Sequence, residues 1–167
     1  MKKSRTILIL RIVLGVLIAL VLSHIWLFSA QDGEESGKLS LAITEKAVDL
    51  THPALHEKAA ERQSLIRAWH PIVRKTGHFG EYAVLGLLIM GEFFCFSGKR
   101  ALQASFSLGL CAVLAALDEW HQTFVSGRAG QWQDVLLDSA GALCGILFLC
   151  LCVLIIRSLR SRPRTGA

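Results

Sequence analysis

The stretch SAGALCGILFLCLCVLII, residues 139–156, decides the fold class of this chain. It carries no charged side chain and is too long and continuous for a single β-strand. A helix needs roughly 20 mostly apolar residues to cross a lipid bilayer, and within lipid a helix bonds all of its own backbone groups. The stretch therefore predicts a membrane-spanning helix, which extends back to Asp134.

Three further segments approach the same length and apolar character: 7–28, 79–96 and 101–124. The composition agrees, since 53% of the 167 residues are hydrophobic and the mean hydropathy is +0.49, too apolar for a soluble domain. We predict an all-α integral membrane protein with four transmembrane helices, a multi-pass protein of the cell membrane. The first segment is longer than the roughly 7–15 apolar residues of a secretory signal, so we expect it to remain as an anchor.

The distribution of cations predicts the orientation. Nine lysines and arginines, with no acidic residue among them, lie before the first span, between the second and third, and after the fourth. They are Lys2, Lys3, Arg5, Lys99, Arg100, Arg157, Arg160, Arg162 and Arg164. Cytoplasmic loops carry an excess of such residues, so both termini are predicted to be cytoplasmic. Residues 31–75, with seven acidic and seven basic residues, and the loop 125–133 are predicted to face outward.

This pattern divides the chain into four parts. They are an N-terminal anchor helix (1–28), an extracytoplasmic loop with an interfacial helix (29–73), a helical core (74–157) and a basic cytoplasmic tail (158–167). Within the loop, residues 31–37 are polar with two glycines, which predicts irregular backbone. After Pro53, apolar residues from Leu55 to Trp69 recur near helical spacing, which predicts an amphipathic helix at the outer interface.

Polar residues gather where three predicted helices reach the outer side: the start of the second, the end of the third and the start of the fourth. They are Lys75, His78, Glu81, Tyr82, Asp118, Glu119, Gln122, Arg128, Asp134 and Asp138. Charged groups in membrane spans are costly and usually face a cavity or a partner. The cluster therefore predicts an outward-facing pocket, with the glycines Gly141 and Gly145 against a neighbouring helix. The alternative is that the acids only pair with Lys75 and Arg128 and fix the helix register.

Three motifs follow one another through this cluster. They are Lys75-x-x-His78-Phe79-x-x-Tyr82-x-x-Leu85, Asp118-Glu119-x-x-Gln122-x-Phe124-x-x-Gly127-Arg128 and Asp134-x-x-x-Asp138-x-x-Gly141-x-x-x-Gly145. Together they resemble the VanZ-like family of bacterial membrane proteins, over about residues 74–150. The family often has an acid where Arg74 stands and an asparagine where Asp138 stands. The resemblance implies a cell-envelope protein and, for the family's namesake, resistance to teicoplanin-type glycopeptide antibiotics; it implies no established reaction.

Two functional hypotheses fit the cluster. In the first, the pocket binds an anionic lipid, wall-precursor or lipoglycopeptide group, and Lys75 and Arg128 hold its phosphate or carboxylate. The other predicted ligand-binding residues are His78, Tyr82, Asp118, Glu119, Gln122, Asp134 and Asp138. In the second, the protein is an enzyme acting on a lipid-linked envelope substrate, with His78 or Glu119 as general base. A hard cation on Asp118, Glu119 and Asp134 would suit the second hypothesis, but the sequence contains no metal or cofactor motif, and we predict neither.

Other classes are disfavoured. A nucleic-acid partner is not expected, because the excess of positive charge follows the membrane topology. A transporter is disfavoured because the acids lie at one end of the bundle. Glu92, deep in the second span, is predicted to reach the cytoplasmic interface or Lys99. Homo-oligomer formation is left open.

Overall fold

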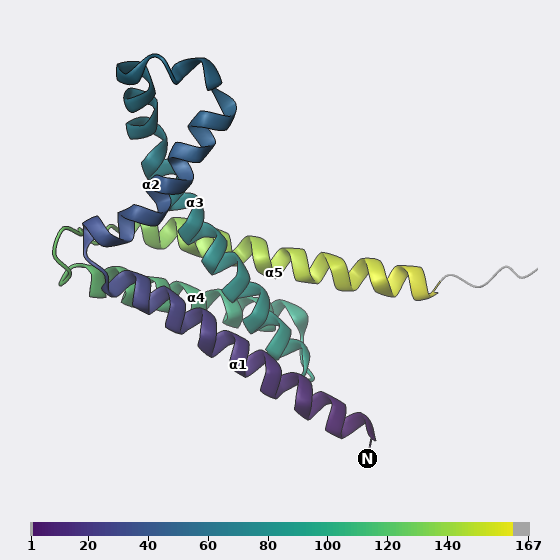
Figure 1. Ribbon diagram of the computed structural model, residues 1–167. Helices are drawn as coiled ribbons and strands as arrows, with labels where there is room; N and C mark the ends of the chain where they lie inside the picture. Colours follow the sequence, from purple (N-terminus) through teal and green to yellow (C-terminus); the bar gives the residue numbers. More distant parts are fainter. Residues whose placement is uncertain (1, 162–167) are drawn as a thin grey trace, which may run out of the picture.

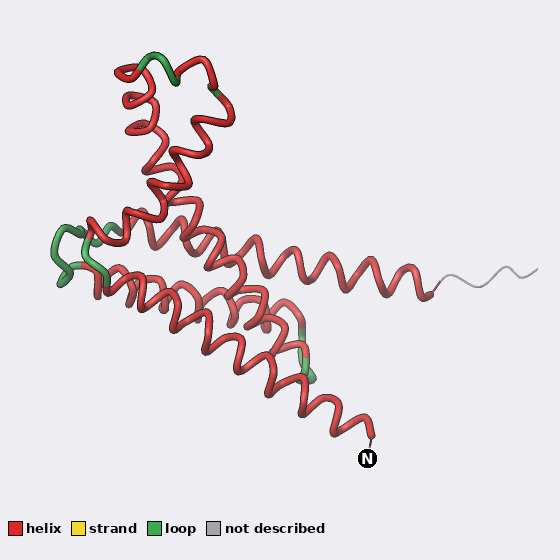
Figure 2. Tube along the Cα trace, viewed as in Figure 1, coloured by secondary structure: helices red, strands yellow, loops and turns green. Residues whose placement is uncertain are grey.

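The computed structural model describes residues 2–161, so the predicted basic tail lies outside the described residues from 162 onward. Within this range the chain forms five α-helices and a short 3-10 helix, with no strand. They are α1 (Lys2–Ala30), α2 (Gly33–Thr51), η1 (Pro53–Leu55), α3 (Ala59–Phe94), α4 (Arg100–Gln122) and α5 (Trp132–Ser161) (Figures 1 and 2). The all-α prediction is confirmed.

Three of these helices, α1, α4 and α5, are long and apolar enough to cross a membrane. Their surfaces expose large apolar side chains: Leu20 on α1 is 61% exposed and Leu154 on α5 is 62% exposed. Such continuous apolar faces are typical of helices surrounded by lipid rather than water. The molecule is a helical membrane protein in character, and the N-in, C-in orientation remains a prediction.

The remaining predicted span, 79–96, forms the second half of α3. This helix packs against α1, α4 and α5 and so occupies the middle of the bundle (Figure 1). It carries His78, Glu81 and Glu92, and it is not among the helices that qualify as spans by length and hydropathy. Four spans therefore remain a prediction, in which α3 crosses the membrane shielded by its neighbours.

The glycines of α5 lie against α3, as predicted. A Cβ atom at Gly145 would collide with the backbone carbonyl oxygen of Ala83, and one at Gly141 would collide with that of Phe79. The two backbones can approach this closely only because these positions have no side chain. Beside this contact, Tyr82, Leu85 and other buried apolar residues of α3 form the core with α1, α4 and α5.

Glu92 pairs with a residue that the sequence pattern did not indicate. Arg11 of α1 donates from Nε to Glu92 Oε1 at 2.7 Å, and its guanidinium lies 4.2 Å from the centre of the Phe96 ring. Of the two predicted alternatives, contact with Lys99 is wrong, and the position of Glu92 at the cytoplasmic interface stays a prediction. The reason is that α1 packs beside α3, which brings an arginine from far along the sequence within reach.

Residues 33–70 form a helical hairpin with α2 as its first arm, so the prediction of irregular backbone over 31–37 is wrong from Gly33 onward. Asp32 caps α2, because its side chain accepts the backbone N–H of Glu35 at 2.7 Å. The backbone N–H of Gly33 donates to the carbonyl of Ser126 at 3.1 Å. The start of α2 is thus bonded both to its own cap and to the loop between α4 and α5.

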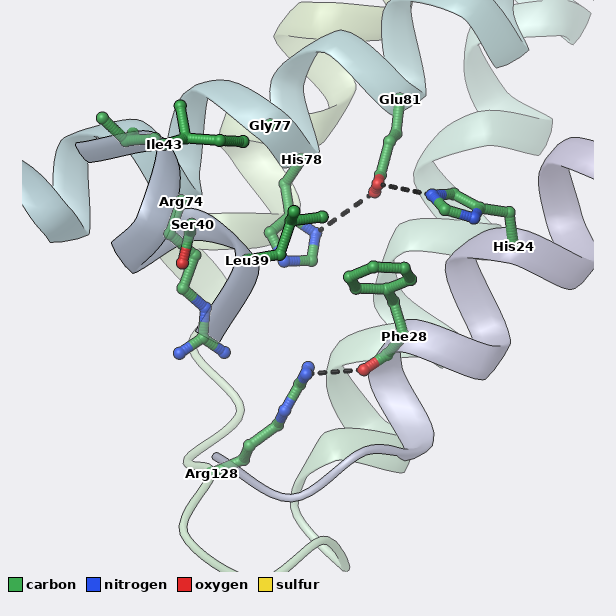
Figure 3. Close-up of a pocket in the computed structure, with 11 residues that line it drawn as sticks. His24, Phe28, Leu39, Ser40, Ile43, Arg74, Gly77, His78, Glu81 and Arg128 are labelled. Carbon is green, nitrogen blue, oxygen red and sulfur yellow. Dashed lines mark hydrogen bonds and ion pairs between the residues drawn. The ribbon is translucent and has the colours of Figure 1, made fainter. Parts of the chain in front are cut away.

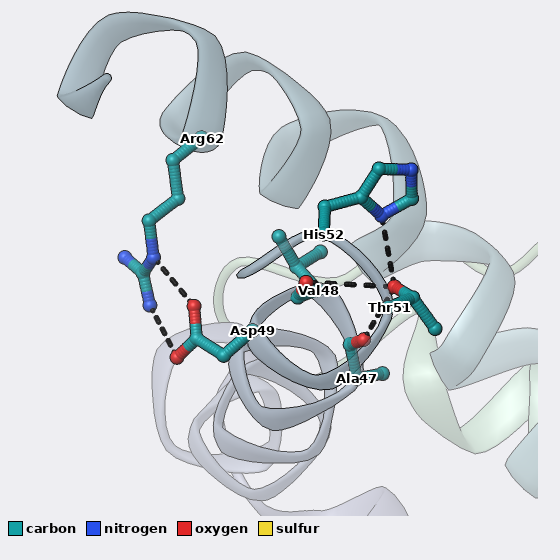
Figure 4. Close-up of polar contacts among 6 residues, drawn as sticks. All are labelled: Ala47, Val48, Asp49, Thr51, His52 and Arg62. Carbon is teal, nitrogen blue, oxygen red and sulfur yellow. Dashed lines mark hydrogen bonds and ion pairs between the residues drawn. The ribbon is translucent and has the colours of Figure 1, made fainter. Parts of the chain in front are cut away.

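The second arm of the hairpin is continuous with the membrane helix. The predicted amphipathic helix and the predicted second span are one helix, α3, which passes through the predicted boundary at 73/74 without a break. Figure 1 shows the hairpin projecting to one side of the bundle. Near its tip, Arg62 donates two hydrogen bonds to Asp49, at 2.7 and 2.9 Å (Figure 4). These bonds hold the pKa of the Asp49 carboxyl below its ordinary value and join the two arms.

The topology can be tested with single cysteines in a variant whose native cysteines are replaced by alanine. Cysteines at Glu57, near the hairpin tip, and at Ser126 are expected to react with an impermeant thiol reagent in intact cells, because both positions are exposed and predicted to face outward. A cysteine at Ser158 is expected to react only after permeabilisation. Protection at Glu57 and Ser126 together with labelling at Ser158 would reverse the orientation.

Candidate functional site

The structure gathers seven of the nine predicted ligand-binding residues around one cavity of about 340 Å³, which we call the polar pocket. It lies where α3, α4, α5 and the α4–α5 loop meet. The seven residues are Lys75, His78, Glu119, Gln122, Arg128, Asp134 and Asp138. The other two predicted residues, Tyr82 and Asp118, are buried and do not line the cavity.

One pair in the pocket has a structural role. Lys75 Nζ lies 2.5 Å from Asp134 Oδ1, which joins the middle of α3 to the first turn of α5. The Lys75 side chain is 48% exposed, so the pair contributes little to stability, on the order of 0–1 kcal/mol. For this pair, the alternative that an acid pairs with Lys75 only to fix the helix register is sufficient. Because Asp134 already binds Lys75, the lysine is less available to a ligand than the sequence suggested.

A second network fixes the floor of the pocket. The amide nitrogen of Gln122 donates to Asp118 Oδ2 at 2.9 Å, to Glu119 Oε1 at 3.3 Å and to Ser29 Oγ at 3.4 Å. The other oxygen of Glu119 accepts the backbone N–H of Gln131 at 2.8 Å. Glu119 is therefore held by the end of α4 and by the loop, and it has a defined orientation before any ligand binds.

Two carboxyl groups, one within this network and one outside it, have oxygens that accept no hydrogen bond from a described residue. Asp138 and Asp118 are fully buried, and both oxygens of Asp138 and Oδ1 of Asp118 have no hydrogen-bond partner among the described residues. Buried polar atoms are bonded in the great majority of cases. Of these two groups Asp138 lines the cavity, and its oxygens are the kind of acceptor that a ligand with hydroxyl or amino donors would satisfy.

The cationic side of the pocket contains two arginines. Arg128 follows Gly127, whose φ of 73° gives the left-handed turn that glycine accepts best, and its Nη2 donates to the carbonyl of Phe28 at 2.6 Å. Its Nε and Nη1 are buried without a partner among the described residues. Burial and the nearby Arg74 lower the pKa of Arg128, although an arginine remains charged at neutral pH.

Arg74 is a site residue that the sequence pattern did not indicate. It lines the polar pocket and makes no hydrogen bond or ion pair with any described residue. Figure 3, which draws an adjoining cavity that Arg74 and Arg128 also line, shows the two guanidinium groups bordering the same opening, one from α3 and one from the loop. In the sequence, Arg74 stands out only as a departure from the family pattern.

A second cavity of about 130 Å³ adjoins the first (Figure 3). We call it the amphipathic pocket, because it shares Arg74, His78 and Arg128 with the polar pocket while its other walls are mostly apolar. These walls come from α1, α2 and α3 and include Phe28, Leu39, Ile43 and Val73. No signal in the sequence indicated that α1 or α2 would contribute to the site.

His78 stands between the two cavities. Its Nδ1 lies 3.9 Å from Glu81 Oε2, beyond hydrogen-bond reach, and the other oxygen of Glu81 lies 3.3 Å from Nε2 of His24. The dashed lines in Figure 3 mark these contacts. The side chains of His78, Glu81 and His24 therefore form a row that begins at the polar pocket and ends on α1.

Comparison with known families adds the deciding observation. The model of the family described as VanZ/LLP1 matches residues 14–155. The chain belongs to the VanZ/LLP1 family. Searches among curated proteins and among solved structures gave no match to this chain.

The VanZ/LLP1 match covers more than the three motifs, since it includes most of α1 and the whole hairpin. This agrees with the geometry, in which Phe28 of α1 and Leu39 of α2 complete the site of this VanZ/LLP1 protein. Among residues 2–161, no group of three His, Cys, Asp or Glu side chains is placed to hold a metal ion. The cation site considered for Asp118, Glu119 and Asp134 is therefore not formed.

Proposed function

We propose that the polar pocket binds an anionic group, phosphate or carboxylate, of a membrane lipid, a lipid-linked wall precursor or a lipoglycopeptide. One observation carries this proposal: the guanidinium groups of Arg74 and Arg128 face the same cavity, and both have N–H donors that no described residue accepts. Neither arginine forms an ion pair with a described residue, and two cations in one partly buried space repel each other. An anion between them removes that repulsion and accepts their hydrogen bonds.

The chemistry of arginine suits this role. A guanidinium presents parallel N–H groups that match two oxygens of a phosphate or carboxylate, and such charge-assisted bonds are about twice as strong as neutral ones. The oxygens of Asp138, which have no hydrogen-bond partner among the described residues, lie on the acidic side of the site. A ligand that carries donors such as hydroxyl or amino groups beside its anionic group would therefore satisfy both sides, as glycolipids and wall precursors do.

In the cell, a protein with this pocket at the outer leaflet holds such a group and changes the access of other molecules to it. Membership of the VanZ/LLP1 family and the motifs quoted above support a place in the bacterial cell envelope. The resemblance to the family's namesake connects this binding with lower susceptibility to teicoplanin-type glycopeptides. Binding of the lipid-linked target or of the antibiotic's own lipid-anchored form gives that effect without any bond being made or broken.

Native mass spectrometry of the protein purified from membranes tests the proposal. We expect the unsubstituted protein to retain a phosphate-bearing or carboxylate-bearing lipid, and the double variant Arg74→Gln/Arg128→Gln to lose it. Arg67→Gln is the matched control, because Arg67 is an exposed arginine that does not line either pocket. Equal retention by all three proteins, in the proportions of the bulk membrane lipids, would contradict an anion site in the pocket.

A second candidate function is catalysis on a lipid-linked envelope substrate. It is favoured by His78 and Asp138, which line one cavity and carry buried side-chain atoms with no hydrogen-bond partner among the described residues. A histidine or a carboxyl group within reach of a bound ligand can accept or donate a proton, and the Arg128 guanidinium can stabilise negative charge that develops beside it.

The two functions differ in their response to amide substitutions. If the pocket only binds, His78→Gln and Glu119→Gln are expected to keep most of the activity in the deletion phenotype, with glycopeptide susceptibility as the first assay. An amide can still form hydrogen bonds, but it cannot exchange a proton near neutral pH. Complete loss in both variants, with normal protein level and normal ligand retention, would replace the binding function by the enzymatic one.

A further inference from the structure

A third hollow, of about 360 Å³, continues from the amphipathic pocket along the gap between α1 and α3. We call it the α1–α3 groove. It is lined by Leu20, Val21, His24, Gly80, Glu81 and Val84. His24 and Glu81 also line the amphipathic pocket, just as Arg74, His78 and Arg128 line both the amphipathic and the polar pockets. The three hollows therefore adjoin one another through these shared side chains, and we call the row of three the track.

Two glycines keep this track open. A Cβ atom added at Gly77, in the amphipathic pocket, or at Gly80, in the groove, would meet no atom within 4 Å. These glycines differ from Gly141 and Gly145, where a Cβ would strike the backbone of α3. Gly77 and Gly80 therefore leave open space in the two hollows, whereas Gly141 and Gly145 allow α5 to touch α3.

The groove opens to the side of the bundle. Its rims are exposed, with Leu20 61% exposed on α1 and Val84 50% exposed on α3. From Leu20 to Phe28 the wall on α1 extends over about 12 Å at 1.5 Å per residue. The track thus begins at two arginines and ends at an apolar opening on a face of the bundle that we predict to contact lipid. Its length of about 12 Å along α1 is enough for part of a hydrocarbon chain.

The charges along the track determine which end of a ligand lies where. Arg74 and Arg128 attract an anionic group at the upper end, whereas Glu81 would repel one at the junction with the groove. Glu81 is itself partnered by His24 at 3.3 Å. Beyond this junction the walls at Leu20, Val21 and Val84 offer only apolar contact, which suits methylene groups.

We propose that the α1–α3 groove holds one hydrocarbon chain of an anionic amphiphile whose head group lies between Arg74 and Arg128. This inference rests on the proposed function and extends it, since it assigns the ligand to the class of lipid-chain phosphates or carboxylates. It also gives the ligand a route: an amphiphile enters sideways from the outer leaflet between α1 and α3, with its chain remaining in the groove.

Photocrosslinking in phosphatidylcholine nanodiscs tests the position of the chain in the unsubstituted protein. Two probes are used, hexadecyl phosphate and a polyisoprenyl phosphate, each carrying a diazirine in its chain, and the labelled peptides are mapped by mass spectrometry. We expect labels on α1 around Leu20 and on α3 around Val84, and the probe that labels more strongly identifies the chain type. Labelling by neither probe above that of the outer faces of α4 and α5 would overturn the groove assignment.

Filling the groove provides the second test. Gly80→Leu is expected to reduce labelling at Val84 by about tenfold, whereas Gly109→Leu, which places the same side chain in open space on α4, leaves it unchanged. Binding of propyl phosphate, which has no long chain, is expected to be the same in Gly80→Leu and in the unsubstituted protein. If Gly80→Leu labels normally while Arg128→Gln still weakens propyl phosphate binding, the groove is wrong and the anion site stands. If propyl phosphate binding does not depend on Arg128, both assignments fail.

Discussion

Gly145→Leu is expected to prevent α3 and α5 from packing, whereas the same substitution at Gly109 is expected to leave the bundle intact. A Cβ at Gly145 would collide with the carbonyl oxygen of Ala83 and lie 3.1 Å from the backbone nitrogen of Leu87, and neither atom can move without the whole of α3. An extra side chain in a packed core lowers the free energy of unfolding by roughly 1–3 kcal/mol when neighbouring side chains can adjust. At Gly145 the new atoms meet backbone, which cannot adjust in this way, so we expect a loss of about 3 kcal/mol or more. At Gly109 nothing lies within 4 Å.

Fluorescence-detected size-exclusion chromatography and thermal unfolding in detergent measure this difference. We expect Gly145→Leu to aggregate or to unfold at a clearly lower temperature, Gly141→Leu to behave in the same way, and Gly109→Leu to match the unsubstituted protein. A Gly145→Leu protein that elutes and unfolds normally would mean that α3 and α5 do not make this contact.

The parts of the fold that follow from local pattern could be predicted from the sequence. Long apolar runs gave α1, α4 and α5, and the glycines of α5 gave its close contact with α3. The start of α2 could not be predicted, because Gly33 and Gly37 resemble a flexible loop. In the structure the small size of Gly33 serves packing, because a Cβ there would strike the carbonyl of Gly127, whereas one at Gly37 would make an ordinary contact 3.7 Å from His70.

The site shows the same division between local and long-range features. Helix periodicity and shared depth placed seven predicted residues around the polar pocket. Tyr82 lies seven residues from Lys75 and so shares its helix face, but it lies deeper and packs in the apolar core. Arg74 and Phe28 were missed because their contribution depends on how α1, α3 and the loop after α4 meet, and no short motif encodes that arrangement.

Arg128→Gln is expected to weaken phosphate binding by at least about tenfold, because a charge-assisted hydrogen bond to a buried ion contributes roughly 1.5–3 kcal/mol. Arg128→Lys is expected to be intermediate, since the charge remains and the paired N–H geometry is lost. Arg128 also donates to the carbonyl of Phe28, so a weaker site could follow from a displaced loop. Arg74→Gln removes this ambiguity, because Arg74 has no hydrogen bond or ion pair with a described residue to lose.

Equilibrium titration of the purified protein in phosphatidylcholine nanodiscs with propyl phosphate is the most direct test of an anion site between Arg74 and Arg128. We expect one saturable site in the unsubstituted protein and in Arg67→Gln, and a loss of affinity of at least about tenfold in Arg74→Gln and in Arg128→Gln, with unchanged unfolding temperatures. Equal affinity in all four proteins, or binding that never saturates, would contradict the site.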